Sequence, residues 1–198
     1  MPQINILPKH IAELIAAGEV VERPASIVKE IMENAIDAGA DKITLEITRG
    51  GITYIRITDN GCGIDRGNIR KAFISHATSK ISTADDLNAI CTLGFRGEAL
   101  ASIAAVSRVE VMTRSENEDV GTRYCIEGGE ETVLDDAGCP KGTTLIVRDL
   151  FYNTPARMKF LKKDVSEGNA VAAVVDRIAL SHPEVSVRFI RDSKDVLF

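Results

Sequence analysis

The hydrophobic and polar positions along the chain predict helices separated by short strands. Ile11, Leu14 and Ile15 recur at helical spacing in the first predicted helix. The second helix begins at Pro24, which suits a first helical position, and ends before Gly39. Asp65 is the predicted N-cap of the third helix. The expected helices are at about residues 8–18, 24–38, 65–75, 98–105, 154–162 and 167–181.

Segments with a period of two predict the strands. Ile43, Leu45 and Ile47 alternate with polar residues, and residues 53–58 repeat this pattern after Arg49-Gly50-Gly51, which predicts a half-buried antiparallel hairpin. Hairpin-connected strands among helices indicate an α+β fold, in which a mixed, largely antiparallel sheet carries helices on one face. Further strands are expected at 108–113, 121–127, 143–148 and 185–191, with a turn at 192–194.

Residues 76–97 show little periodicity and are rich in Ser, Thr, Asp and Gly. We predict a long loop there. A loop of this length inside a compact domain is uncommon and usually functional. Its few apolar residues offset little of the cost of ordering the backbone, so we expect it to be mobile until a ligand orders it.

Composition narrows the class of protein. The 198 residues are 44% hydrophobic and 27% charged, which is typical of a globular protein and sufficient for one domain with a sizeable core. No apolar run approaches the roughly 20 residues of a membrane span, and the N-terminus lacks the features of a secretory signal. We therefore expect a single domain over residues 1–198, no membrane association, and a cytosolic location by default.

Cysteine spacing and charge exclude several kinds of site. The four cysteines and three histidines lack zinc-ligand spacing, so we expect four free thiols. A net charge of −5 disfavours a DNA-binding module. One basic run is either a local nucleic-acid patch or, as we favour, the solvent-exposed face of a helix. It comprises Arg148, Arg157, Lys159, Lys162 and Lys163.

The first candidate for chemistry is a polar stripe on the helix 24–38. Glu30, Asn34 and Asp37 are spaced i, i+4 and i+7, so they fall within about 60° of one another on the helix wheel. A carboxylate one turn from an amide can polarise a water while the amide oxygen binds Mg²⁺. The alternative is the ordinary solvent face of an amphipathic helix.

Three glycine-containing motifs follow. Asp59-Asn60-Gly61-Cys62-Gly63 comes directly after a strand, where a carboxylate can accept a hydrogen bond from an exocyclic amine; by itself a simple turn explains it better. Gly94-Phe95-Arg96-Gly97-Glu98 precedes a helix, and its backbone N–H groups suit phosphate, although the spacing is not a Walker pattern. Gly142-Thr143 begins a strand, which is also a common strand start.

Together and in this order, these motifs resemble the ATP-binding fold shared by type II gyrases, a class of heat-shock chaperones, sensor histidine kinases and MutL, known as the Bergerat fold. Several stretches look specifically like the MutL family of DNA mismatch-repair ATPases, and the resemblance covers nearly the whole chain. Ile31-Met32 stands where many relatives carry Leu-Val, a volume-tolerant change. The stretches are residues 15–21 (IAAGEVV), 76–80 (HATSK), 94–100 (GFRGEAL) and 151–157 (FYNTPAR).

The resemblance implies a role for each motif. Glu30 is the general base for the attacking water, and Asn34 holds the Mg²⁺ that bridges the phosphates. Asp59 accepts the adenine amine with Thr143 nearby, and Gly63 leaves room for the base. Loop residues near 78–80 form part of a lid, and residues 94–97 contact phosphate through the backbone. The implied nucleotide-binding set is Asn34, Asp37, Asp59, Gly63, Thr78, Ser79, Lys80, Gly94, Phe95, Arg96, Gly97 and Thr143.

The implied activity is Mg²⁺-dependent ATP binding and slow hydrolysis to ADP and phosphate, as a nucleotide-gated switch in DNA mismatch repair. The alternative is a nucleotide-binding interaction module with negligible turnover. We expect the chain to be part of a longer protein, because relatives continue into a second domain that supplies a lysine to the γ-phosphate and a C-terminal dimerisation domain. The implied partners are mismatch-recognition and strand-processing proteins, with DNA bound by the whole protein. Self-association follows ATP binding there, and this chain alone is expected to be a monomer. The implied location is the cytoplasm, in association with the nucleoid, in a bacterium, or the nucleus in a eukaryote.

Overall fold

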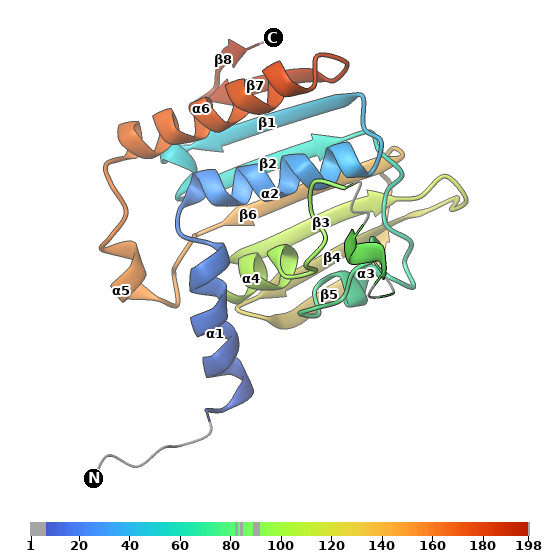
Figure 1. The fold of residues 1–198 in the computed structure, drawn as a ribbon, viewed down its shortest axis with the longest axis horizontal. Coiled ribbons are helices and arrows are strands. Elements are labelled where there is room, and N and C mark those ends of the chain that lie inside the picture. Colours follow the sequence, from blue (N-terminus) through green and yellow to red (C-terminus); the bar gives the residue numbers. More distant parts are fainter. Residues whose placement is uncertain (1–6, 82, 84, 89–91, 198) are drawn as a thin grey trace.

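One mixed sheet organises the described part of the chain. The computed structural model describes residues 7–81, 83, 85–88 and 92–197 (Figure 1). Within them the strand order is β5-β4-β3-β6-β2-β1-β7-β8. β1 and β7 pair in parallel, whereas the other neighbouring strands are antiparallel. The strands are β1 Lys42–Thr48, β2 Tyr54–Asp59, β3 Arg108–Arg114, β4 Gly121–Glu127, β5 Glu130–Ala137, β6 Gly142–Arg148, β7 Ser186–Arg191 and β8 Lys194–Leu197.

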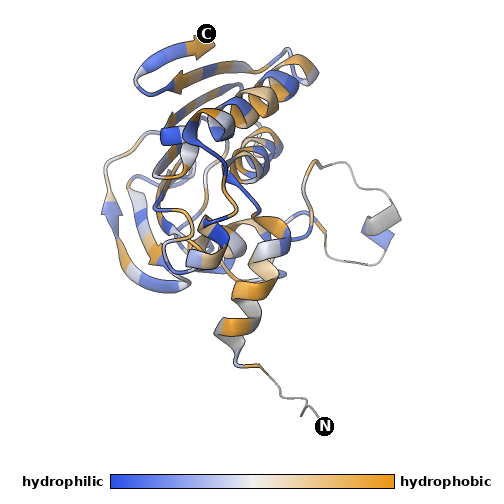
Figure 2. Cartoon of the chain, turned by 90° about the vertical axis from the view of Figure 1, so that its left-hand side faces the viewer, coloured by the Kyte–Doolittle hydropathy of each residue, from blue (hydrophilic) through white to orange (hydrophobic). Residues whose placement is uncertain are grey.

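Helices cover one face of this sheet. The view along the edge of the molecule places the sheet on one side and the helical layer on the other (Figure 2). α2 packs between α6 and α4, and α1 packs against α4. This confirms the expected α+β fold with a largely antiparallel sheet. The α-helices are α1 Lys9–Val20, α2 Pro24–Asp37, α3 Ile69–Ala72, α4 Ala99–Ala105, α5 Pro155–Met158 and α6 Asp164–Ser181; the 3₁₀ turns are η1 Arg49–Gly51 and η2 Asp85–Asn88.

The core forms between the sheet and α2. Ile43, Leu45 and Ile47 of β1 are buried, as the alternating pattern predicts, and they belong to the same cluster as Ile27 and Val28 of α2. Full burial of each such side chain contributes roughly 1.5–3 kcal/mol. The predicted hairpin is also present, since β1 pairs with β2 from Ile43 opposite Asp59 to Thr48 opposite Tyr54. The core therefore fixes α2 over the centre of the sheet, where the polar stripe of this helix can only face away from it.

Two strands and one pairing were not predicted. β5 lies at an edge, and five of its eight side chains are exposed, four of them charged, so the sequence carries no alternating signal. β8 is only four residues long and follows a turn in which Asp192 and Ser193 have left-handed φ angles of 49° and 65°. The parallel pair β1–β7 joins segments far apart in the sequence, which local periodicity cannot show.

Two helices are shorter than predicted. The prediction that Asp65 caps a helix of residues 65–75 is wrong, because α3 covers only Ile69–Ala72 and its N-cap residue is Asn68, with no side-chain capping bond. The prediction of a helix to Lys162 is also wrong, because α5 ends at Met158. Here the N–H of Lys162 donates to the Glu167 carboxylate at 2.9 Å rather than to a helical carbonyl.

The loop 76–97 is described only in part. Residues 82, 84 and 89–91 lie outside the described residues, so the prediction of mobility before ligand binding remains untested there. The described residues 85–88 form η2, and Thr83 and Asp86 exchange hydrogen bonds across it.

The described residues also bear on the predicted free thiols and on the predicted absence of a membrane span. Cys62, Cys125 and Cys139 are free thiols as predicted, while Cys91 lies outside the described residues. Among the helices of the described ranges, none combines the length and apolarity of a membrane span.

Candidate functional site

A large cavity lies between α2, the loop 76–97 and the nearby strand ends. Its volume is about 1380 Å³, above the roughly 300–1,000 Å³ of typical ligand pockets. All thirteen residues predicted from the motifs line it. Apolar side chains complete the wall, among them Ile31, Leu100, Val111 and Leu145. The cavity therefore combines apolar surface suited to a flat ring with the polar groups that the sequence singled out.

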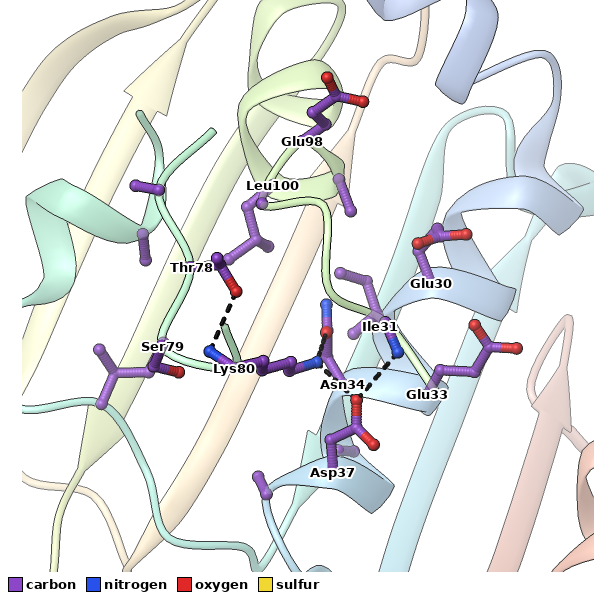
Figure 3. A pocket seen from close by; sticks show the side chains of 18 of the residues that line it. Glu30, Ile31, Glu33, Asn34, Asp37, Thr78, Ser79, Lys80, Glu98 and Leu100 are labelled. Carbon is purple, nitrogen blue, oxygen red and sulfur yellow. Dashed lines mark hydrogen bonds and ion pairs between the residues drawn. The ribbon is translucent and has the colours of Figure 1, made fainter. Parts of the chain in front are cut away.

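The polar stripe of α2 faces this cavity (Figure 3). Ile27, Val28 and Ile31 on the rest of the helix are buried, so packing determines the direction in which Glu30 and Asn34 point. The stripe is thus part of the cavity wall rather than an ordinary solvent face. Its residues come from one rigid helix, which keeps their spacing constant.

Asp59 is held in place by backbone donors. Its Oδ1 atom accepts hydrogen bonds from the N–H of Gly61 at 2.9 Å and the N–H of Thr143 at 3.3 Å. No hydrogen bond to Oδ2 is present among the described residues. Burial raises the pKa of Asp59 above its ordinary value, against the opposing effect of these two N–H donors. The carboxylate is therefore oriented by one oxygen and offers the other to a ligand.

Thr113 is a site residue that the sequence did not reveal. Its hydroxyl group is fully buried, accepts a hydrogen bond from the N–H of Ile64 at 2.8 Å, and lies 3.1 Å from both the Gly142 carbonyl and the Thr143 hydroxyl. It thus joins the segment after Asp59 to the start of β6. A signal was present, because Thr113 continues the buried positions of Val109 and Val111 with a polar residue.

Two glycines are required by close backbone approaches. Gly63 has φ of 74°, and a Cβ atom there would collide with the Arg114 carbonyl. Gly142 has φ of 112°, and a Cβ atom there would collide with the Asp59 carbonyl. The contact that demands glycine at position 63 is therefore with β3. Its predicted place beside a base remains a prediction.

A lysine ammonium lies against the polar stripe. Nζ of Lys80 is 2.9 Å from Asn34 Oδ1 and 2.5 Å from an Asp37 carboxylate oxygen (Figure 3). The Lys80 and Asp37 side chains are 20% and 7% exposed, so this pair is mostly shielded from water. Amide and carboxylate oxygens are also ligands that Mg²⁺ accepts. The oxygens of Asn34 and Asp37 therefore form a cation-binding site.

Two stems of the loop 76–97 are described: residues 76–81 form its near stem and residues 92–97 its far stem. Asp37 also binds the far stem. Its carboxylate accepts hydrogen bonds from the N–H of Leu93 at 2.9 Å and the N–H of Gly94 at 3.2 Å. Burial alone would raise the pKa of Asp37, but the hydrogen bonds from Lys80 and from these two N–H groups outweigh it and hold the pKa below its ordinary value. One carboxylate thus joins both stems of the loop to the end of α2.

The base of the loop is closed by a second set of contacts. The N–H of His76 donates to the Gly97 carbonyl at 2.9 Å, and the ring of His76 lies 3.2 Å from the Glu98 carboxylate. Gly97 has φ of 65°, and a Cβ atom there would collide with the Ala77 backbone. Thr78 accepts a hydrogen bond from the N–H of Lys80. The segments around residues 76–80 and 94–97 therefore enter the cavity wall side by side.

Glu30 is more open than Asp37. Its side chain is 32% exposed, and its carboxylate lies 3.3 Å from the Lys29 ammonium, which also bonds Glu33 at 2.9 Å. Glu30 and Glu33 both line the cavity. A carboxylate in this position can contact both the cavity and water.

The basic run does not form one helix face. Arg148 lies on β6 and bonds Glu110, whereas Arg157 on α5 donates to the Ile15 carbonyl of α1. Lys159 and the two lysines that follow it are exposed, but they come after the end of α5. The preferred interpretation, a solvated helix face, is therefore wrong in its geometry, because the helix stops before the lysines begin.

The described residues contain no group of three or more His, Cys, Asp or Glu side chains that could hold a metal ion. A cation in the cavity would therefore depend on Asn34, on Asp37 and on oxygens supplied by a ligand. The cavity thus combines one oriented carboxylate, a cation-binding site on a helix and neighbouring glycines. This arrangement is expected of a nucleotide site.

Comparison with known proteins identifies the family of this chain. Residues 22–128, which include most of the cavity wall, match the model of the histidine kinase-, DNA gyrase B- and HSP90-like ATPases. The chain belongs to this ATPase family. Within the family, it is similar to proteins named DNA mismatch repair protein MutL, which confirms the resemblance found in the sequence motifs.

Two of these relatives show how far the similarity extends. The MutL protein of Agathobacter rectalis is 56% identical over 197 residues, which is 100% of this chain and 30% of the relative. The MutL protein of Caldanaerobacter subterraneus subsp. tengcongensis is 54% identical over 194 residues, which is 98% of this chain and 33% of the relative. The chain thus spans about a third of the length of the curated relatives it matches.

Solved structures of related proteins share the fold. The Aquifex aeolicus MutL ATPase domain complexed with ADP has a TM-score of 0.71 and 33% identity, over 90% of this chain and 63% of that one. A structure described as the N terminal domain of a DNA repair protein has a TM-score of 0.76 and 29% identity, over 94% of this chain and 54% of that one. The sheet and its helical layer are therefore those of MutL ATPase domains.

Proposed function

We propose that this chain binds Mg²⁺-ATP in the cavity beside α2 and hydrolyses it slowly to ADP and phosphate, as the nucleotide-gated switch of a DNA mismatch-repair protein. The main support for this proposal is a single cavity lined by the oriented Asp59 carboxylate, the cation-binding site of Asn34 and Asp37, and the backbone of Gly94–Gly97. The solved relative complexed with ADP supports the choice of an adenine nucleotide.

Adenine recognition is assigned to Asp59. Its Oδ1 atom is occupied by the N–H groups of Gly61 and Thr143, so Oδ2 is the acceptor left for the exocyclic amine. Leu145 and Val111 supply apolar surface to the same cavity. A guanine base presents a carbonyl where adenine presents the amine, and two acceptors facing each other repel. The site should therefore prefer ATP and ADP to GTP.

The phosphates and Mg²⁺ are assigned to α2 and the loop. Asn34 would hold the metal ion through Oδ1, the atom that bonds the Lys80 ammonium in this structure. When bound, Mg²⁺ neutralises phosphate charge and orients the γ-phosphate. The backbone of residues 94–97 and the side chains of Thr78, Ser79 and Lys80 line the remaining wall and would contact the phosphate oxygens.

Glu30 is assigned as the general base for the attacking water. It lies one helical turn before Asn34 on the same face of α2. Its carboxylate would therefore polarise a water beside a γ-phosphate whose metal ion Asn34 holds. Its side chain is one-third exposed and shares Lys29 with Glu33. We infer slow turnover from this, because a base in contact with solvent and with an ammonium is weakly preorganised.

We also propose the role in DNA mismatch repair, because it belongs to whole proteins of which this chain spans about a third of the length. Mismatch-recognition and strand-processing proteins, and DNA contacted by the whole protein, are the partners that this role implies. The alternative function is a nucleotide-binding interaction module in which turnover is negligible. The two differ only in hydrolysis, since both need the cavity.

Calorimetric titration tests the proposal. A non-hydrolysable ATP analogue should bind this chain in the presence of Mg²⁺, with weaker binding after Mg²⁺ is chelated and much weaker binding of the GTP analogue. Absence of binding by either nucleotide would refute the proposal. Phosphate release by the full-length protein then decides between the two functions, since turnover abolished by Glu30→Gln supports the ATPase and no measurable turnover supports the interaction module.

A further inference from the structure

The cation that occupies the α2 oxygens in this structure belongs to the protein itself. Nζ of Lys80 donates to Asn34 Oδ1 at 2.9 Å and forms an ion pair with Asp37 at 2.5 Å. Gly94 adjoins the same place, since a Cβ atom on it would lie 3.5 Å from Lys80 Nζ and 3.7 Å from Asn34 Oδ1. The ammonium is thus enclosed by α2 on one side and by the far stem of the loop on the other.

This arrangement and metal binding at Asn34 exclude each other. Mg²⁺ requires its oxygen ligands at about 2.0–2.1 Å in near-octahedral geometry. The ammonium takes up the approach to the same Oδ1 atom, and two cations within a few ångströms repel each other strongly in a partly shielded site. A metal ion can therefore reach Asn34 only if the Lys80 ammonium leaves.

We propose that the Lys80 ammonium and Mg²⁺ alternate at Asn34, so that Lys80 is a built-in stand-in for the metal. This inference rests on the proposed function of the cavity. Arrival of Mg²⁺ with its nucleotide displaces the ammonium from Asn34 and Asp37, and the phosphates supply the negative charge that receives it. The location of the Lys80 ammonium therefore reports whether the metal is bound.

The exchange has a consequence for the loop. Asp37 holds the near stem through Lys80 and the far stem through the N–H groups of Leu93 and Gly94. Departure of the ammonium releases the near stem from α2, while the two N–H bonds can persist. The two described stems of the loop are thus coupled to the metal through one carboxylate. Its near stem should move when Mg²⁺ and nucleotide bind together, and much less when nucleotide binds without the metal.

Substitution of Lys80 tests the exchange in two ways. Without nucleotide or metal, the amides of residues 78–81 in Lys80→Met should exchange with deuterium faster than in the wild type, because the link to Asp37 is lost. The second readout uses a non-hydrolysable ATP analogue held at a fixed saturation. The Mg²⁺ concentration that gives half of the metal-dependent change in amide exchange (the Mg²⁺ midpoint) should fall about fivefold or more in Lys80→Met, the lower end of ordinary coupling between two sites. Loss of phosphate contacts changes the nucleotide affinity, which the fixed saturation removes from the comparison.

Two further variants serve as controls. Lys71→Met removes the same charge from the same cavity wall, but Lys71 bonds Asn68 rather than the stripe, so both readouts should match the wild type. Asp37→Asn should speed exchange at both stems, because it loses the ion pair with Lys80 and weakens the bonds from Leu93 and Gly94.

The outcomes separate the two proposals. An analogue that fails to bind the wild-type chain refutes the proposed function. An analogue that binds with Mg²⁺, together with an unchanged Mg²⁺ midpoint and unchanged loop exchange in Lys80→Met, leaves the function standing and overturns the stand-in role. A midpoint that shifts equally in Lys71→Met also overturns it, because the effect would then be general electrostatics of the cavity.

Discussion

At the scale of single residues, Asp59 combines a binding role with a cost to the fold. Its carboxylate is mostly buried, and burial raises its pKa, so ionisation is less favourable in the folded chain than in the unfolded one. A raised pKa means that the folded state binds the proton more tightly than the unfolded state does. The protonated residue therefore stabilises the fold at low pH, and this contribution is lost as pH rises through the folded-state pKa.

Asp59→Asn should separate these two effects. The asparagine oxygen can still accept from Gly61 and Thr143, but the amide group that replaces Oδ2 cannot accept the adenine amine. We expect ATP and ADP affinity to fall by roughly 10- to 150-fold, the value of a hydrogen bond to a charged group. Denaturant unfolding at neutral pH should show a more stable variant, and this difference should shrink as pH falls. A variant that binds ADP like the wild type would remove Asp59 from the adenine site.

The role of Glu30 is tested by an adjacent carboxylate on the same helix. In the full-length protein, Glu30→Gln should leave ATP binding nearly intact and slow hydrolysis by roughly 10²–10⁴, as expected for loss of a general base. Glu33→Gln is the matched control, because Glu33 lines the same cavity and shares Lys29. Equal turnover of the two variants in a phosphate-release assay would contradict the assignment.

At the scale of elements, the site depends on a hydroxyl group between strands. Thr113 of β3 bonds the segment after β2 through Ile64 and the start of β6 through Gly142 and Thr143. Three elements distant in the sequence thus meet at one buried oxygen. Opposite it on β4, Thr122 is equally buried, but its hydroxyl group has no hydrogen-bond partner in the described structure.

This pair of threonines gives a matched experiment. Thr113→Val should destabilise the fold by about 1–3 kcal/mol, because the buried N–H of Ile64 loses its acceptor. It should also weaken nucleotide binding, because the segments that carry Gly63 and Thr143 are no longer joined. Thr122→Val should be neutral or stabilising, since it removes a buried hydroxyl group without a partner. Equal unfolding free energies for the two variants would show that Thr113 is not a structural hub.

At the scale of the whole molecule, Glu167 joins the helical layer. Its side chain is almost fully buried at the start of α6, and it accepts hydrogen bonds from Nε and Nη2 of Arg23, which precedes α2. It also accepts the N–H of Lys162 from the segment after α5. Glu167 therefore links α2, the helix of Glu30 and Asn34, to the exposed lysine-containing segment that follows α5.

Glu167→Gln should destabilise the whole domain. Its amide group would face the Arg23 guanidinium donor to donor, at a cost of about 1.5–3 kcal/mol, the range for hydrogen bonds to charged groups. Asp164→Asn removes the exposed ion pair with Arg49 at the same end of α6 and should cost little. The measurement is urea unfolding of both variants, and a Glu167→Gln midpoint equal to that of Asp164→Asn would contradict this role.

Local sequence determined the parts of this protein that depend on neighbours in the chain. The i, i+4, i+7 stripe on α2, the β1–β2 hairpin and the motifs at Asp59 and Gly94 could be read directly, because helix and strand periods place nearby residues on known faces. The order of these motifs also identified the ATPase family. Within the cavity, every residue predicted from the motifs is present.

Tertiary structure alone decided what depends on distant segments. The parallel β1–β7 pair, the edge strand β5, the Thr113 junction and the place of Lys80 against Asn34 and Asp37 join residues far apart along the chain. The segment after α5 is held in the same way, because a carboxylate of α6 accepts the N–H of Lys162. Periodicity carries no information about such contacts, since they form only when packing brings separate elements to the same point.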